Sequence, residues 1–297
     1  MSILFAQPPE NGRDQNSISI VDLQSEPAVV QPTRSLIWRV ERSDMDRPSY
    51  VFAIPYLVPN DWFFLPPELS NIVTSVDQLV LEVDPSYRNM DVIHRGAVPF
   101  DSTLEALLPR RQYNEMYAFI RDSLSAMARY KLENRYEPLM LAQQIMADYC
   151  AGFRVSRQPY YYEKYLAQAI GKPVRSLQSE WTRTAWMEDY NITEQTDALV
   201  NIFRDRQVLK VKYKSYLRAY RSGNLDEAAL LALDLPDLGG GTGRMIGDKN
   251  LSWLPMLSRS MRFESLLIAV NAAQLAGEQG LLHQLRRQGY DVSPVGR

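Results

Sequence analysis

The stretch Gln78-Leu-Val-Leu-Glu-Val83 is mainly apolar, with a single acid, and its neighbours along the chain decide the fold class. A short apolar run of this kind is typical of a strand that is buried on both faces. A second strand is predicted over residues 50–58, with Asp46-Arg-Pro48 in the turn before it. A helix is predicted between these two strands, around Pro66 to Val76. The order strand, helix, strand implies a parallel pair and therefore an α/β core.

Further strands on both sides of this unit complete the predicted sheet. Leu36, Trp38 and Val40 alternate with polar neighbours, which predicts a strand over residues 35–41. Near the C-terminus, strands are predicted over residues 268–271 and 290–295. A helix over residues 278–288 is expected between those two strands. The expected fold class is α/β, with a mixed central sheet.

The middle of the chain, about residues 102–235, is predicted to be a large helical insertion. One helix is expected to begin at Ser102-Thr-Leu-Glu105, which has the spacing of a capping box. Its buried face is expected to carry Tyr113, Met116, Ile120, Leu124 and Met127. Pro138 suits the first turn of a further helix. Thr193 is predicted to cap a long helix that ends near Gly223.

Residues 1–34 are polar and rich in turn residues, with too few apolar side chains to build a core. They are predicted to form an extended N-terminal arm, followed by an α/β domain over residues 35–297. Within the arm, Ser17-Ile-Ser-Ile-Val21 alternates like a strand and is suited to pairing with a sheet edge. We therefore predict that the arm contacts a protein partner, through Ile18, Ile20 and Leu23. An ordinary disordered tail is the alternative.

Composition and charge limit the classes of function. The chain has 297 residues, 45% of them hydrophobic and 23% charged, with a net charge of −2 and a pI near 5.8. The absence of a dense basic stripe argues against nucleic acid as a partner. No uncharged apolar run reaches the roughly 18 residues of a membrane-spanning helix. The N-terminus lacks the basic region of a signal peptide. The localisation is unknown from the sequence: we expect the cytoplasm for the sequence as written, and the periplasm if a signal peptide was removed before Ser2.

Two stretches far apart in the sequence carry a resemblance. Tyr50-Val-Phe-Ala-Ile-Pro-Tyr56-Leu and Ala269-Val-Asn-Ala-Ala-Gln274-Leu resemble the two motif regions of the TraB/GumN family, whose relatives include the Tiki proteases. In that family each stretch ends in Gly-x-x-His, and the two form the halves of a metallohydrolase site. Further similarities follow in the family's order at Ser35-Leu-Ile-Trp38, Leu79–Val83, Gly171-Lys-Pro-Val174, Asn250 with Trp253, and Gly289-Tyr-Asp-Val292. The resemblance runs from about Ser35 to the C-terminus and implies a TraB/GumN-like α/β fold.

The chain departs from this family at its polar positions. By resemblance, its equivalents of the family's chemical residues are Tyr56, Glu82, Tyr160, Gln178, Asn250 and Gln274. Tyr56 and Gln274 stand where the family has histidines. Imidazole is the usual neutral nitrogen ligand of a catalytic metal, and neither Tyr nor Gln readily replaces it. Because only Glu82 and Asn250 remain of these residues, the resemblance implies a pseudoenzyme with no metal and no cofactor.

Other residues offer little to rebuild a metal site or a nucleophile. The two histidines, His94 and His283, are expected at the surface or at helix ends. Glu82 alone cannot hold a divalent ion tightly, since a catalytic site needs about three protein ligands and an open position. Cys150 is the single cysteine, so no disulfide forms within the chain. It is expected to pack in the interior rather than act as a nucleophile.

The leading hypothesis is a catalytically inactive TraB/GumN-like protein that acts as a binding or scaffold component of a larger bacterial assembly. Two alternatives stay open. One is a metal-dependent hydrolase or protease that uses Glu82 with further ligands. The other is a small-molecule binder that uses the former active-site cleft, lined by Tyr56, Tyr160 and Gln274. A bound metal would favour the hydrolase over the scaffold. A cleft filled by the chain's own aromatic side chains would favour the scaffold over the small-molecule binder, which needs an open cleft.

Overall fold

The structure is a computed structural model that describes residues 34–55, 57–59, 62–84, 103–133, 137–152, 156–157, 159–179, 190–233, 235 and 243–296. The chain divides into two units, Met1–Gln31 and Pro32–Arg297, and every described residue belongs to the second. Apart from Arg34, the predicted arm with Ile18, Ile20 and Leu23 lies outside the described residues. The arm therefore stays a prediction.

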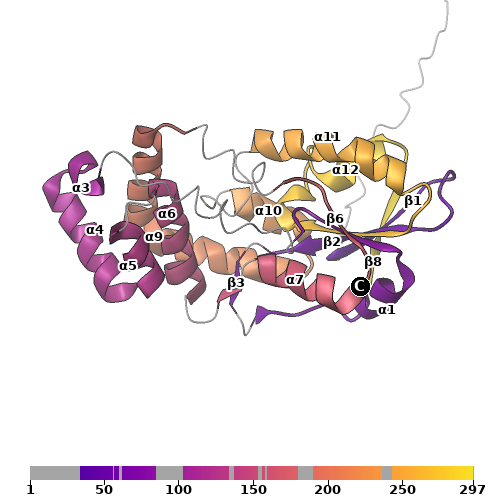
Figure 1. The fold of residues 1–297 in the computed structure, drawn as a ribbon, viewed down its shortest axis with the longest axis horizontal. Helices are drawn as coiled ribbons and strands as arrows, with labels where there is room; N and C mark the ends of the chain where they lie inside the picture. Colours follow the sequence, from indigo (N-terminus) through magenta and orange to yellow (C-terminus); the bar gives the residue numbers. More distant parts are fainter. Residues whose placement is uncertain are drawn as a thin grey trace, which may run out of the picture. The chain divides into compact units, whose positions relative to one another are not determined.

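A six-stranded sheet forms the centre of the described part, in the order β6-β4-β7-β2-β1-β8 (Figure 1). Its strands are β1 (Ile37–Glu41), β2 (Ser49–Ile54), β4 (Gln78–Leu81), β6 (Val174–Ser176), β7 (Leu266–Asn271) and β8 (Asp291–Val295). Strands β6, β4, β7 and β2 run parallel, whereas β1 is antiparallel to both of its neighbours. The predicted α/β fold with a mixed sheet is confirmed.

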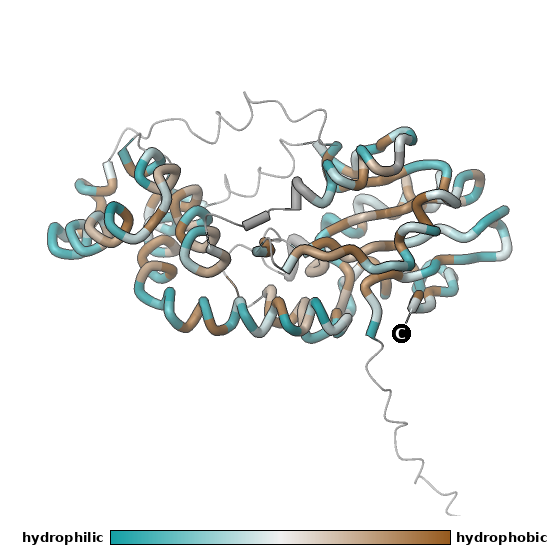
Figure 2. Tube along the Cα trace, turned by 90° about the horizontal axis from the view of Figure 1, so that it is seen from below, coloured by the Kyte–Doolittle hydropathy of each residue, from teal (hydrophilic) through white to brown (hydrophobic). Residues whose placement is uncertain are grey.

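The strands β2 and β4 are parallel, as the strand–helix–strand order predicts, but they are not neighbours. β7, from near the C-terminus, lies between them and pairs with both. Every residue of β4 and β7 is buried, which explains why apolar residues run through both strands without alternation. Figure 2 shows this concentration of apolar residues along the strands, whereas hydrophilic and apolar residues alternate along the helices. The helix between β2 and β4 is α1 (Leu69–Ser75).

The prediction of one strand over residues 50–58 is wrong in its second half. β2 ends at Ile54, since the next residue, Pro55, has no N–H group to donate to a neighbouring strand. The chain then forms the short strand β3 (Val58–Pro59), which pairs with β5 (Ser156–Arg157) in a separate two-stranded sheet. Tyr56 falls between β2 and β3 in the sequence and is outside the described residues.

The described helices between β4 and β7 belong largely to the predicted insertion. They are α3 (Leu104–Leu107), α4 (Arg110–Ser123), α5 (Ala126–Glu133), α6 (Pro138–Ile145), the π-helix η3 (Met146–Gly152), α7 (Pro159–Ile170), α9 (Ile192–Arg221), α10 (Leu225–Leu233) and α11 (Gly243–Ser260). The long helix α9 packs against α6, η3 and α10. After β7 follow the 3-10 turn η5 (Ala272–Gln274) and α12 (Leu281–Arg287). None of the helices in the described ranges is both long and apolar enough to span a membrane.

The single helix predicted from Ser102 to Met127 is wrong, because the chain breaks it twice. Thr103 caps the first piece, and its hydroxyl accepts a hydrogen bond from the helix backbone. Pro109 then separates α3 from α4, and Leu124 has an extended backbone between α4 and α5. The predicted apolar face does not continue past this second break, so Met127 is 52% exposed.

Asn191, rather than the predicted Thr193, caps α9. The side-chain oxygen of Asn191 accepts from the N–H groups of Thr193 and Glu194, while the Glu194 carboxylate accepts from the N–H of Asn191. The helix ends near Gly223, as predicted. Gly223 has a positive φ of 75°, and a Cβ atom there would lie 3.0 Å from the backbone of Arg34. Glycine is therefore required where the start of the domain crosses the end of α9.

Candidate functional site

The carboxyl ends of the parallel strands β6, β4 and β7 meet at one edge of the sheet, where ligand sites of α/β proteins collect. Glu82 follows β4, Gln178 follows β6 within two residues, and Asn271 is the last residue of β7. β2 shares this direction, so the strands next to Tyr56, Glu82 and Gln274 lie in one sheet. The fold thus brings together segments almost 200 residues apart.

Glu82 links the ends of β4, β6 and β7 by hydrogen bonds. Its Oε1 accepts a hydrogen bond of 2.7 Å from the backbone N–H of Asn271. Its Oε2 receives a long contact of 3.5 Å from Nε2 of Gln178, and its backbone carbonyl accepts from the N–H of Gln178 at 3.0 Å. The residue is only 8% exposed. A buried carboxylate needs such donors, because desolvation without them is costly.

After β7 the chain turns sharply and buries Gln274. The side-chain oxygen of Asn271 accepts from the N–H of Ala273 at 2.9 Å and thereby starts the turn η5. Gln274 is fully buried, and neither its amide oxygen nor its amide nitrogen has a hydrogen-bond partner within the described residues. Buried polar atoms of this kind are rare, and water or a ligand usually satisfies them.

Asn250 holds the segment that follows this turn. It lies fully buried on α11, and its Nδ2 donates to the carbonyl oxygens of Gln274 at 2.9 Å and Gln279 at 2.7 Å. The close approach extends to Gly280, where a Cβ atom would lie 2.3 Å from the carbonyl oxygens of Leu275 and Ala276. Asn250 is thus a structural clamp between α11 and the loop after β7.

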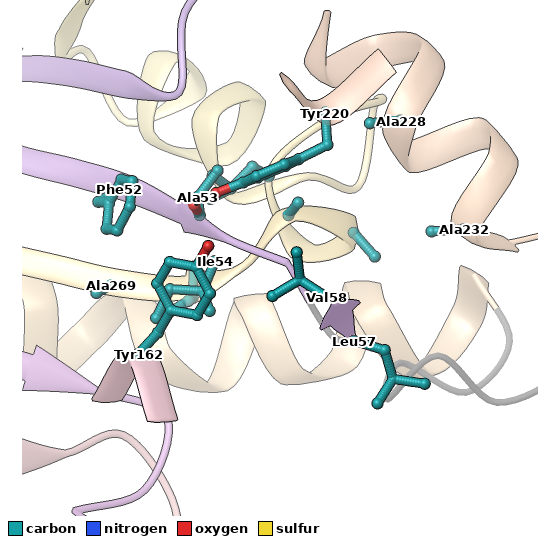
Figure 3. Close-up of a cluster of buried hydrophobic side chains, with 14 of the residues drawn as sticks. Phe52, Ala53, Ile54, Leu57, Val58, Tyr162, Tyr220, Ala228, Ala232 and Ala269 are labelled. Atoms are coloured by element: carbon teal, nitrogen blue, oxygen red, sulfur yellow. Dashed lines mark hydrogen bonds between the residues drawn. The ribbon is translucent and has the colours of Figure 1, made fainter. Parts of the chain in front are cut away.

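Tyrosine side chains occupy the carboxyl end of β2. Tyr220 donates to the carbonyl oxygen of Ala53 at 3.0 Å, and Tyr213, two turns earlier on α9, donates to that of Leu57 at 3.1 Å. Tyr162 on α7 donates to the carbonyl of Phe64 at 3.4 Å. Figure 3 shows Tyr162 and Tyr220 beside Ala53 and Ile54, where β2 ends. All three tyrosines are buried.

The Tyr220 hydroxyl is a neutral donor. Burial raises its pKa well above the usual value of 10, and Tyr162 and Tyr216 nearby raise it further. These hydroxyl bonds leave no signal in the sequence, because their acceptors are backbone carbonyls. The hydroxyls hold both sides of the stretch that contains Tyr56.

Four of the six predicted site residues are described by the structure, and they form two groups. Glu82 and Gln178 meet at the ends of β4 and β6, and Asn250 contacts the backbone of Gln274. Tyr160 lies on α7, but its side chain is outside the described part, as are the residues Tyr56 and His94. His283 is exposed on α12. Burial raises the pKa of Cys150 to about 12, so this thiol is not a nucleophile near neutral pH.

The donors at these strand ends fit a catalytic divalent metal poorly. Glu82 already accepts a backbone N–H group, and the amide of Gln274 is a weaker ligand than an imidazole. In the described ranges, no three His, Cys, Asp or Glu side chains gather into a group that could hold a metal ion.

Comparison with known proteins identifies the family. The model of the TraB/PrgY/gumN family matches residues 36–294. The chain belongs to the TraB/PrgY/gumN family. The match includes both motif regions, and it confirms the resemblance that the sequence carries. No curated protein and no solved structure matches this family member.

Proposed function

We propose that this TraB/PrgY/gumN family member is a non-hydrolytic binding component of a larger assembly. The observation that carries the proposal is the bonding of Glu82, the acid that the resemblance leaves at the strand ends. Its carboxylate accepts from the backbone of Asn271 and contacts the Gln178 amide, so it holds neighbouring strands together. A carboxylate used in this way contributes to the fold of the domain, which a binding protein needs as much as an enzyme does.

The tyrosines at the end of β2 support the same proposal. A scaffold protein is expected to fill the region of a former active site with its own side chains. Tyr162, Tyr213 and Tyr220 are buried there, and each hydroxyl bonds to the backbone between Ala53 and Phe64. Buried aromatic rings whose hydroxyls are hydrogen-bonded to the backbone resist displacement by a substrate.

Binding of a small polar molecule is the second candidate, and Gln274 favours it. A buried amide group without a partner costs about 1–3 kcal/mol for each unsatisfied atom. Both amide atoms of Gln274 are in this state within the described residues. A molecule that offers one donor and one acceptor would satisfy them, as two ordered water molecules would.

Hydrolysis of unstructured peptides by the full chain, supplied with manganese, cobalt or zinc, tests the proposal. We expect wild type and Glu82→Gln to give the same rate as a blank without protein. Turnover by the wild type that Glu82→Gln abolishes would establish the hydrolase instead.

The partner contact is proposed to lie in the N-terminal arm, through Ile18, Ile20 and Leu23. Removal of residues 1–30 is expected to leave the domain folded and to abolish co-purification with the partner. A matched full-length variant has Ser in place of Ile18, Ile20 and Leu23. It should lose co-purification with the partner to the same extent as the truncated chain. If the truncated chain keeps every partner at unchanged affinity, the arm is only a tail.

A further inference from the structure

Three aromatic rings form a row in the helical part, away from the strand ends. Phe203 on α9 lies with its ring centroid 5.5 Å from that of Phe119 on α4, and Phe119 lies 5.6 Å from Tyr149 on η3. Both pairs meet edge to face, the arrangement that aromatic rings prefer. Tyr149 belongs to a π-helix, a rare element that is frequent at functional sites.

Two cations of α9 lie on this row of rings. The guanidinium carbon of Arg206 is 4.5 Å from the ring centroid of Phe203 and 4.7 Å from that of Phe119. The ammonium nitrogen of Lys210 is 4.6 Å from the ring centroid of Tyr149. Arg206 and Lys210 are four residues apart, so they are neighbours on one face of the helix. The rings therefore hold two positive charges on one face of α9.

The described residues do not neutralise this pair of charges. No ion pair joins Arg206 or Lys210 to a carboxylate there, whereas Arg204 on the same helix pairs with Asp205. Arg206 donates to the carbonyl of Phe203, but its Nε is buried and lacks an acceptor in the described part. The buried acid Asp148, which precedes Tyr149 on η3, already accepts from Ser125 and Gln144.

The rest of α9 adds to the positive potential. Every charged residue from Arg206 to Arg221 is basic. Like charges at positions i and i+4 repel each other and destabilise a helix. An arrangement that keeps two such charges on aromatic rings, with donors left over, is suited to an anion that contacts both. Uncharged residues separate these cations in the sequence, so the run does not stand out as a dense basic stripe.

We propose that Arg206 and Lys210 bind an oxyanion of the phosphate class. Their side chains project from positions whose Cβ atoms are about 5–6 Å apart on the helix, so one phosphate group that lies over this face can contact both. The guanidinium supplies the N–H groups of its planar fork that do not donate to Phe203, and the ammonium supplies a point charge, which is a common division of roles in phosphate binding. The site uses none of the residues that carry the proposed function.

Calorimetric titration of the full chain with inorganic phosphate, at ionic strength held constant with sodium chloride, tests this site. We expect saturable binding by wild type and a rise of its melting temperature with phosphate. Arg206→Gln and Lys210→Gln should each bind about tenfold to hundredfold more weakly, because each removes one charged donor. Arg204→Gln and Lys214→Gln change charge equally at exposed positions of α9 and should bind as wild type does.

Circular dichroism establishes that each variant is folded, and Lys210→Gln decides the question if Arg206→Gln fails to fold. The proposal is overturned if phosphate gives no effect beyond sodium chloride on the wild type, or if the two control variants lose as much affinity as the two site variants. Sodium acetate at the same ionic strength is the comparison ligand. Equal affinity for acetate would show a general carboxylate site and contradict the phosphate class.

Discussion

The Oε1 atom of Glu82, at the end of β4, accepts the backbone N–H of Asn271, at the end of the neighbouring strand β7, over 2.7 Å. The carboxylate is almost completely buried, and the register of the two strands places this donor at its side. Hydrogen bonds to a charged group contribute more than those between neutral groups, about 1.5–3 kcal/mol. The negative charge of Glu82 is therefore expected to stabilise the sheet edge.

Replacement of Glu82 by Gln should reduce the free energy of unfolding by about 1–3 kcal/mol. The variant keeps the shape of the side chain but loses its charge, and its new NH2 group faces the amide of Gln178. Urea denaturation measures the effect. Glu278→Gln changes an exposed acid and serves as the control, with an expected change within ~0.5 kcal/mol. A Glu82→Gln variant as stable as the control would show that the carboxylate has no structural role.

Tyr220→Phe should destabilise the domain by about 1–3 kcal/mol, because it leaves the carbonyl of Ala53 without its donor in a buried place. Tyr165→Phe is the matched control, since Tyr165 is 46% exposed. Equal stability of the two variants in chemical denaturation would remove the support that the tyrosines give to the proposed function.

Alkaline pH gives an independent check on Tyr220. Its raised pKa means that the folded protein keeps the phenol proton at a pH where the unfolded chain releases it. Stability must therefore fall as the pH rises above about 10, the value for an unfolded tyrosine. The loss of stability above pH 10 should be smaller in the Tyr220→Phe variant than in the Tyr165→Phe variant. An identical pH dependence of the two variants would contradict the buried, neutral state of Tyr220.

Asn250→Ala should lower the free energy of unfolding by more than about 2 kcal/mol, because the carbonyls of Gln274 and Gln279 both lose their donor. Asn201→Ala, on the exposed face of α9, brings the same gain in helix propensity and is the control. Differential scanning calorimetry compares them. If both variants melt at the same temperature, Asn250 is not a clamp between α11 and the loop after β7.

Lys131 should make the free energy of unfolding depend on pH between about pH 8 and pH 10. Burial lowers its pKa from 10.5 to about 8, although Asp148 opposes the shift. Between these two values the unfolded chain binds more protons than the folded one, so the stability contribution of this group rises with pH. Lys131→Met should remove a rise on the order of 1 kcal/mol between pH 8 and pH 9.5. Lys214→Met, at an exposed position, should keep the rise; a profile unchanged by Lys131→Met would contradict the lowered pKa.

Much of the sheet could be predicted from the sequence because its strands are short apolar runs bounded by turn residues. Two strands are buried on both faces, and their uninterrupted apolar residues predict this directly: Leu79-Val-Leu81 and the run over residues 268–271. The position of β7 between β2 and β4 could not be predicted in this way. Strand pairing between residues almost 200 positions apart has no local signal, because it depends on how whole faces of the sheet are covered.

The candidate site rests on the family resemblance, which names residues and not their contacts. That resemblance selects Glu82, Gln178, Asn250 and Gln274, but their partners are mostly backbone groups, which every residue carries. The hydroxyl bonds of Tyr213 and Tyr220 were missed for the same reason. Arg206 and Lys210 were missed because the aromatic rings that fix them come from three separate helices.

Metal content after loading tests the central claim most directly. The purified full chain would be incubated with zinc, manganese or cobalt, dialysed, and measured by elemental analysis, with Glu82→Gln alongside. Since the resemblance puts Tyr56 and Gln274 at the family's histidine positions, we predict no stoichiometric metal in either protein. One tightly held ion per wild-type chain, lost in Glu82→Gln, would contradict the account and identify the strand ends as a working metal site.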